Sequence, residues 1–170
     1  MNKTTYAKTA ERLLKKANGR DMVKLAKNLG IIVKFFDLGG VLGIYAYKLK
    51  SRFIYVNNNI ENEHLLNMVV AHEIGHDALH RHLARQALYD DAPLSYLNRT
   101  EMEANKIAAH LLISTEDLLE VAEYSDTIYT MASALSVNEN LLIIKLNELN
   151  KMGYEFNVSL LPDNMFLKNC

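Results

Sequence analysis

Hydrophobic residues recur every three to four positions through most of the chain, and this spacing predicts helices. Between the second and third of these helices, three short runs rich in β-branched and aromatic residues predict strands. Residues 85–99 are rich in polar and turn-forming side chains and are expected to form a surface loop. The expected helices cover residues 4–17, 21–29, 62–83, 100–112, 115–124, 126–135 and 138–152, and the expected strands cover 31–36, 41–47 and 52–56. The pattern indicates an α+β fold, mostly helical, with one small three-stranded sheet beside the long helix and a helical hairpin near the C-terminus.

Length, composition and charge narrow the class of protein. The chain has 170 residues, of which 49% are hydrophobic and 23% are charged, as in an ordinary folded domain. Nineteen basic residues against 20 acidic ones leave a net charge of −1, which does not favour a strong non-specific nucleic-acid binder. The one cysteine, Cys170, excludes an intrachain disulfide. We therefore expect residues 1–170 to form a single domain.

The sequence also bears on the compartment in which the protein works. The longest apolar runs are only a few residues, far below the roughly 20 that a membrane-spanning helix needs. The N-terminal stretch is charged and amphipathic, without the apolar core of a signal peptide. We therefore expect a cytoplasmic protein that does not act at a membrane.

One segment, HEIGH at residues 72–76, carries the strongest chemical signal. His72 and His76 are four residues apart, so their imidazoles lie about 40° apart around a helix and can reach one metal ion. Glu73 is badly placed to join them, but its carboxylate can take a proton from water beside that ion. Both histidines share the face of the helix that leucine, methionine and valine would bury, where an imidazole needs a partner. Two core histidines bonded to the backbone are the alternative, and they leave the placement of Glu73 unexplained.

A catalytic zinc site needs a third protein ligand and one open position. The helix expected at residues 100–112 offers Glu101, Glu103 and His110. A helical projection places Glu101 inside the buried stripe, whereas Glu103 and His110 point toward solvent. A buried carboxylate is costly unless it is paired or binds a metal. Glu101 is therefore the predicted third ligand, and Glu103 is expected to be a solvated surface charge.

Taken together, these two helices resemble the ImmA/IrrE family of small zinc metallo-endopeptidases. The residues that carry the resemblance are Ala71-His72-Glu73-Ile74-Gly75-His76 with His80 one turn later, and Glu101-x-Glu103-Ala104-Asn105-x-x-Ala108 ending in Leu111-Leu112. The resemblance covers about residues 20–120, which would form the catalytic core, with a C-terminal helical subdomain at about 125–153. The family usually has Met-Pro after the two leucines, where this chain has Ile113-Ser114, and Ser114 can still cap the next helix.

The resemblance implies a function as well as a fold. It implies that His72, His76 and Glu101 bind one zinc ion (Zn2+) per chain and that Glu73 is the general base. It also implies a protein substrate, namely a helix-turn-helix transcriptional repressor of a phage or mobile element. An extended substrate could pair with the strand expected at residues 53–56. The alternative is a regulatory module that holds a repressor or DNA without cutting, and the intact Glu73 favours the enzyme.

Other residues near the two motifs support weaker hypotheses. His80 and His82 follow along the same helix, but a tetrahedral site is already filled, so an outer or helix-end position is favoured over a ligand. Asp90, Asp91 and Tyr96 of the expected loop could line a substrate cleft, although a solvated connector is favoured. Tyr89 or Tyr96 could stabilise an oxyanion, but their spacing does not establish that role.

The C-terminal third resembles a helix-turn-helix in its pattern, with a short turn near Val137. Its second helix carries Lys145 and Lys151 but also Glu139 and Glu148, so it lacks the basic face of a recognition helix. We expect a structural hairpin that packs on the core, with docking of DNA or a partner protein as the alternative, and we do not expect direct DNA binding.

Overall fold

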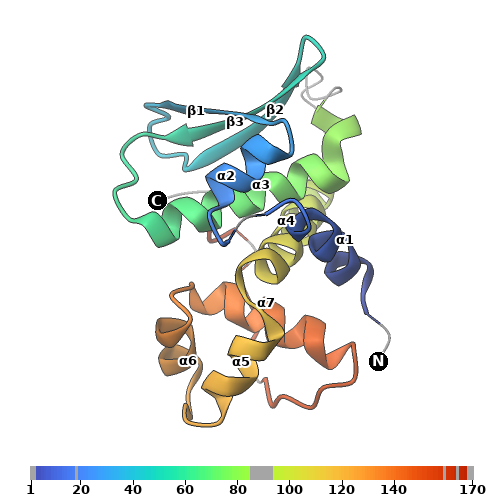
Figure 1. The fold of residues 1–170 in the computed structure, drawn as a ribbon, viewed down its shortest axis with the longest axis vertical. Helices are drawn as coiled ribbons and strands as arrows, with labels where there is room; N and C mark the ends of the chain where they lie inside the picture. The colour runs from blue at the N-terminus through green and yellow to red at the C-terminus, as the bar shows by residue number, and fades with distance from the viewer. Residues whose placement is uncertain (1–2, 18, 85–93, 159, 164, 168–170) are drawn as a thin grey trace.

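The computed structural model of the chain describes residues 3–17, 19–84, 94–158, 160–163 and 165–167, with seven helices and three strands along them (Figure 1). Every element predicted from the sequence is present. The main difference is α4, which begins at Leu94, so residues 94–99 of the expected loop are helical. The elements are α1 (Thr5–Leu14), α2 (Met22–Asn28), β1 (Ile32–Phe36), β2 (Gly43–Lys48), β3 (Ser51–Asn57), α3 (Glu63–Ala84), α4 (Leu94–Leu112), α5 (Thr115–Ala122), α6 (Ile128–Ala134) and α7 (Glu139–Asn150).

Short polar side chains begin several of these helices because they satisfy backbone N–H groups that have no partner within the helix. The Asp21 carboxylate accepts from the backbone N–H of Lys24 at the start of α2. Ser114 accepts from the backbone N–H of Asp117 at 3.0 Å, so it caps α5 as predicted. The α2 helix is followed by Gly30 at φ +74°, a left-handed conformation that glycine adopts at little cost.

The three strands form one mixed sheet in the order β1-β3-β2. β1 runs parallel to β3, and β2 runs antiparallel to it, so that Val56 of β3 lies between Phe35 and Gly43. The predicted pairing of a substrate with residues 53–56 is therefore wrong, because neighbouring strands already occupy both sides of β3. A local pattern identifies a strand but does not say which strand lies in the middle of the sheet.

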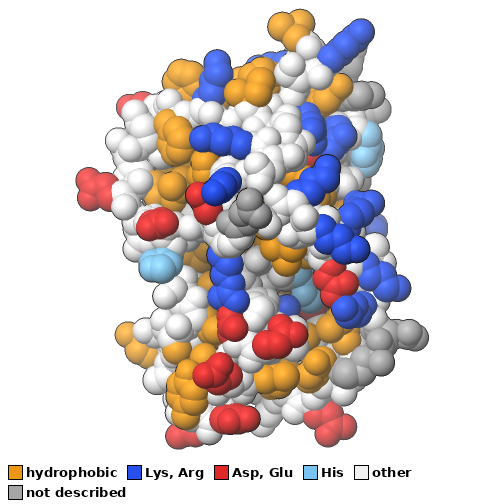
Figure 2. Space-filling model, in the orientation of Figure 1, with side chains coloured by type: hydrophobic (Ala, Val, Ile, Leu, Met, Phe, Trp, Pro, Cys, Tyr) orange, Lys and Arg blue, Asp and Glu red, His pale blue; other side chains and the backbone are white. Residues whose placement is uncertain are grey.

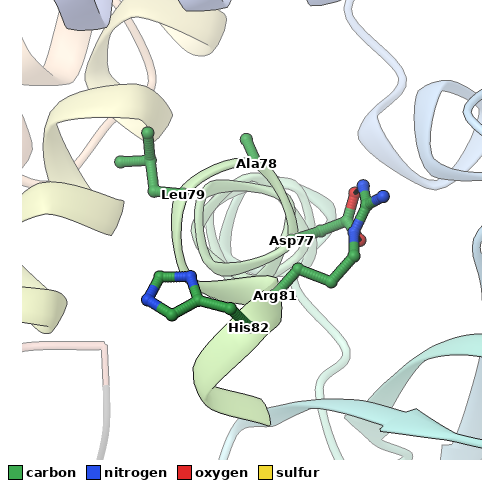
Figure 3. A pocket seen from close by; sticks show the side chains of 5 residues that line it. All are labelled: Asp77, Ala78, Leu79, Arg81 and His82. Atoms are coloured by element: carbon green, nitrogen blue, oxygen red, sulfur yellow. Dashed lines mark hydrogen bonds and ion pairs between the residues drawn. The ribbon is translucent and has the colours of Figure 1, made fainter. Parts of the chain in front are cut away.

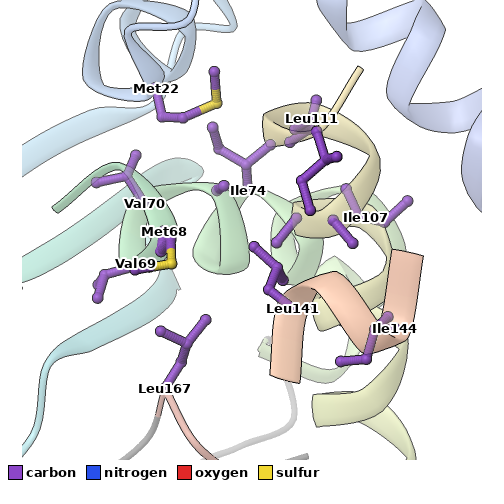
Figure 4. Close-up of a cluster of buried hydrophobic side chains, with 14 of the residues drawn as sticks. Met22, Met68, Val69, Val70, Ile74, Ile107, Leu111, Leu141, Ile144 and Leu167 are labelled. Atoms are coloured by element: carbon purple, nitrogen blue, oxygen red, sulfur yellow. The ribbon is translucent and has the colours of Figure 1, made fainter. Parts of the chain in front are cut away.

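The helices are stacked on one face of the sheet (Figure 1). α2 and α3 pack on the sheet, α4 packs on α3, and α1 and α7 pack on α4. Fully buried Ile74, Ile107 and Leu141 meet where α3, α4 and α7 come together (Figure 4). Burying side chains of this size contributes roughly 1.5–3 kcal/mol each. This apolar layer holds the two predicted site helices in contact.

The contact between α3 and α4 is closest at Gly75. A Cβ atom at this position would lie 2.7 Å from the carbonyl oxygen and 2.8 Å from the Cα of Ala104. Real Cβ atoms do not approach backbone that closely, so only glycine permits this spacing. Ala104 lies between Glu103 and Asn105 in the sequence, so the contact sets how near the polar residues of α4 come to α3.

The C-terminal hairpin packs on the core as predicted, and this contact buries Lys145 of α7 and His110 of α4. Lys145 is only 2% exposed and donates to Nδ1 of His110 at 3.0 Å. His110 was predicted to face solvent, and it is buried because α7 covers that side of α4. Lys145 therefore cannot belong to a solvent-facing recognition surface. On the face in Figure 2, several acidic side chains gather over the part of the molecule formed by α5 and α6.

No helix in the described part of the chain combines the length and the apolar character that a membrane span requires.

Candidate functional site

The two histidines of the HEIGH segment and Glu101 lie together between α3 and α4. Nε2 of His72 is 3.0 Å from Nε2 of His76 and 3.1 Å from Oε2 of Glu101. Nε2 of His76 is 3.6 Å from the other oxygen of Glu101. One ligand atom from each of these residues lies within 4.8 Å of the others, so the group could hold a metal ion. Among the described residues, no other group of this kind is present.

Asn105 determines how His72 presents its ring. The Asn105 side chain is fully buried, and its Oδ1 lies 2.7 Å from Nδ1 of His72. An amide oxygen only accepts hydrogen bonds, so Nδ1 of His72 carries the proton and donates it. In the neutral ring, Nε2 then presents its lone pair toward His76 and Glu101. The sequence analysis missed this role, although Asn105 follows Glu101 by one helical turn and so shares its face.

The electrostatics of the group fit a bound cation. Burial lowers the pKa of His72, but the hydrogen bond that its protonated ring donates to Glu101 and the charges of Glu73 and Glu101 outweigh it, so the net shift is upward. Burial raises the pKa of Glu101, but hydrogen bonds from His72 and His76 outweigh it and hold the pKa well below its ordinary value. Both shifts favour positive charge at the centre of the group. Two imidazole nitrogens and one carboxylate are a zinc-binding set, so these residues fit a divalent metal ion.

Glu73 lies beside this group without joining it. Its side chain is buried, and it faces the start of β2. A Cβ atom at Gly43 would lie 3.0 Å from Oε1 of Glu73 and 2.6 Å from the side chain of Val69. The backbone of β2 therefore passes directly beside the Glu73 carboxylate. Any residue larger than glycine at position 43 would force Val69 or Glu73 to move.

Glu103 is not the solvated surface charge that the helical projection predicted. Its side chain is 18% exposed, and its Oε2 lies 3.0 Å from Nε2 of His80. Its other oxygen accepts from Arg99 at 3.0 Å. Burial raises the pKa of Glu103, but the hydrogen bonds from His80 and Arg99 outweigh it and lower the pKa. The prediction failed because α3 packs against this part of α4, which a projection of one helix does not represent.

A separate hollow of about 390 Å³ lies around the last turns of α3 (Figure 3). None of the three residues in the possible metal group lines it. Asp77 at its edge accepts hydrogen bonds from Tyr45 at 2.8 Å, Arg52 at 3.0 Å and Arg81 at 2.9 Å. This cluster ties α3 to β2 and β3 and leaves the Asp77 charge compensated. The residues that line the hollow are Asp77, Ala78, Leu79, Arg81 and His82.

The remaining candidates are only partly covered by the structure. His82 is exposed on the last turns of α3 and has no place in the possible metal group. Tyr89, Asp90 and Asp91 lie outside the described residues. Tyr96 lies within α4, but its side chain is also outside the description. An oxyanion-stabilising role for Tyr89 or Tyr96 therefore stays a hypothesis from the sequence.

Comparison with known protein families gives one match that covers most of the chain. Residues 26–147 match the family model of the IrrE N-terminal-like domain, Peptidase_M78. The match spans the sheet, both helices of the site and most of α7. It begins six residues later than the range 20–120 that the two motifs suggested and continues past its C-terminal end, to residue 147. No curated protein matches the chain.

Proposed function

The chain belongs to the IrrE N-terminal-like family of metallopeptidases, and we propose that it is a zinc-dependent endopeptidase. In this proposal His72, His76 and Glu101 bind one zinc ion, and Glu73 is the general base. The observation that carries the proposal is the meeting of two imidazole Nε2 atoms and a buried carboxylate within 4.8 Å. A purely structural site would have no need of the buried Glu73 beside it.

The proposed ligands are held in place by residues of α4 and by the packing of α3. Asn105 accepts the Nδ1 proton of His72 at 2.7 Å and so keeps Nε2 free to bind. Glu101 is ionised at neutral pH because its pKa is far below the ordinary value. Zinc, when bound with three protein ligands and one open position, activates water and polarises a peptide carbonyl.

Glu73 moves the proton in the proposed reaction. Its carboxylate takes a proton from the attacking water as the new C–O bond forms at the substrate carbonyl. The same carboxyl group then delivers this proton to the nitrogen of the leaving amine as the C–N bond breaks. The net reaction is the hydrolysis of one peptide bond by one water molecule, and Glu73 returns to its ionised state.

The substrate that we propose is a protein bound in an extended conformation along β2. β2 is an edge strand, and no described strand pairs with its outer side. Because β2 passes beside Glu73 at Gly43, a peptide added to that edge would bring its backbone near the general base. The resemblance of the sequence motifs to the ImmA/IrrE family supports a helix-turn-helix transcriptional repressor of a phage or mobile element as the protein cut.

The variant Glu73→Gln tests this function. Gln is nearly the same size as Glu but cannot take the proton, so cleavage should fall at least about 100-fold while about one zinc per chain remains bound. The assay incubates each zinc-loaded variant with a helix-turn-helix protein encoded by a neighbouring open reading frame, which is the candidate substrate, and follows fragments by mass spectrometry. Glu63→Gln changes an exposed glutamate of the same helix and should cleave as the wild type does. Glu101→Ala should lose both zinc and cleavage.

Two results would contradict the proposal in different ways. Equal cleavage by Glu73→Gln and the wild type would remove Glu73 from the role of general base. Binding of the repressor by the wild type without fragments at any zinc loading would favour the regulatory module that does not cut.

A further inference from the structure

His80 is a buried histidine that the proposed reaction does not use. It follows His76 by one turn of α3, and its Nδ1 lies 3.2 Å from Nδ1 of His76. Its other ring nitrogen, Nε2, lies 3.0 Å from Oε2 of Glu103. His80 is thus placed between a proposed metal ligand and a carboxylate on α4, and both of its ring nitrogens have a partner.

His76, His80 and Glu103 form a row of hydrogen-bonding groups, and their donors and acceptors allow one consistent arrangement when a metal occupies the site. A metal bound at Nε2 of His76 uses the lone pair of that nitrogen, so the ring proton of His76 sits on Nδ1. Two ring nitrogens 3.2 Å apart need one donor and one acceptor, so Nδ1 of His80 accepts. The proton of His80 then sits on Nε2 and is donated to the Glu103 carboxylate.

The carboxylate at the end of this row is itself held from two elements. Arg99 donates to Oε1 of Glu103 from one turn earlier on α4. Tyr6 of α1, which packs on α4, lies near the same carboxylate, and burial together with the charge of Glu103 raises the pKa of the Tyr6 hydroxyl. The two oxygens of Glu103 are therefore held by Arg99 from α4 and by His80 from α3. Rotation of the His80 ring would break its bond to Glu103 or to His76, so the ring is oriented.

We propose that His80 is a positioning residue for the metal ligand His76. It accepts a hydrogen bond from Nδ1–H of His76 and donates one to Glu103, and so directs Nε2 of His76 toward the metal. This proposal rests on the proposed function, since it requires a metal ion at His72, His76 and Glu101. In this arrangement each of the two histidine ligands has its outer ring nitrogen, Nδ1, held by a hydrogen bond. Asn105 holds the outer nitrogen of His72, and the pair of His80 and Glu103 holds that of His76.

The comparison of His80→Leu with His80→Gln tests the proposal. Gln offers an acceptor oxygen to His76 and a donor N–H to Glu103, so it can preserve the arrangement, whereas Leu fills space without either. The dissociation constant for zinc, measured by competition with a chelator, should rise about 10–100-fold in His80→Leu. It should stay within about threefold of the wild type in His80→Gln. His64→Leu, an exposed histidine of the same helix, is the matched control and should leave zinc affinity unchanged.

A spectroscopic measurement separates positioning from a general loss of stability. In the zinc-loaded wild type and in His80→Gln, the Nδ1–H of His76 should be visible by ¹⁵N NMR and protected from exchange with water. In His80→Leu this protection should be lost while the amide spectrum remains that of a folded chain. Should His80→Leu fail to fold, Glu103→Gln provides the second test. It retains an acceptor for His80 without the charge, and it should weaken zinc binding severalfold.

The outcomes identify which idea fails. Equal zinc affinity in His80→Leu and the wild type would overturn the positioning role and leave the proposed metal site intact. A His80→Gln variant as weak as His80→Leu would also overturn it. A wild-type chain that does not bind zinc at all would contradict the proposed function, and the role of His80 with it.

Discussion

Gly75→Ala is the substitution for which the structure makes the sharpest prediction. Alanine is normally better than glycine in a helix by about 1 kcal/mol, so the change would stabilise an isolated α3. Here the new methyl group would lie 2.7 Å from the carbonyl oxygen and 2.8 Å from the Cα of Ala104. Those atoms belong to the backbone of α4 and cannot rotate aside, so the two helices must separate.

The size of the effect follows from this clash. Overpacking of a well-packed core costs about 1–3 kcal/mol, and a backbone neighbour favours the upper part of that range. After the gain in helix propensity, we expect a net loss of about 1–2 kcal/mol in the free energy of unfolding. Glu101 and Asn105 lie close to Ala104 on α4, and metal–ligand distances tolerate only about 0.2 Å. The dissociation constant for zinc should therefore rise at least about tenfold.

Two measurements check the prediction, and a second glycine provides the control. Urea unfolding of the metal-free chain gives the stability, and competition with a chelator gives the zinc affinity. At Gly40 no atom lies within 4 Å of an added Cβ and φ is not positive, so Gly40→Ala should change the stability by less than about 0.5 kcal/mol. A Gly75→Ala variant as stable as the wild type, with unchanged zinc affinity, would refute the close contact of the two helices.

Two further predictions concern the stability of the fold, one at acidic pH and one at the turn between β2 and β3. Burial and the Lys145 ammonium lower the pKa of His110 from 6.5 to about 3, so the unfolded chain takes up that proton first as the pH falls. The free energy of unfolding should therefore decline below pH 6.5, by about 2 kcal/mol at pH 5. Urea unfolding at several pH values should show a shallower decline for His110→Gln. An equal decline in the variant and the wild type would contradict the lowered pKa of His110. In the turn between β2 and β3, Leu49 and Lys50 have φ values of 50° and 61°, a left-handed conformation that Asn and Gly adopt at lower cost. Replacing them with Asn-Gly should raise the free energy of unfolding by about 1 kcal/mol. An unchanged midpoint in urea unfolding would argue against strain in this turn.

Some features could be predicted from the sequence because they depend on neighbouring residues along the chain. The spacing of His72 and His76 places both imidazoles on one face of any helix that contains them. The apolar stripe around Glu101 identifies it as a carboxylate on a buried face, and the structure brings its oxygens within 3.1 Å of His72 and 3.6 Å of His76. Ser114 was identified as a helix cap because capping needs only the next three residues.

Other features were decided only when the elements packed together. The burial of His110 and Lys145 depends on α7 covering α4, and the pairing of His80 with Glu103 depends on the crossing of α3 and α4. The central position of β3 depends on two strands that reach it from different parts of the chain. In each case the interaction joins residues far apart in the sequence. A periodic pattern in one helix or strand shows which face is apolar, but only the tertiary structure shows what that face and its edges meet.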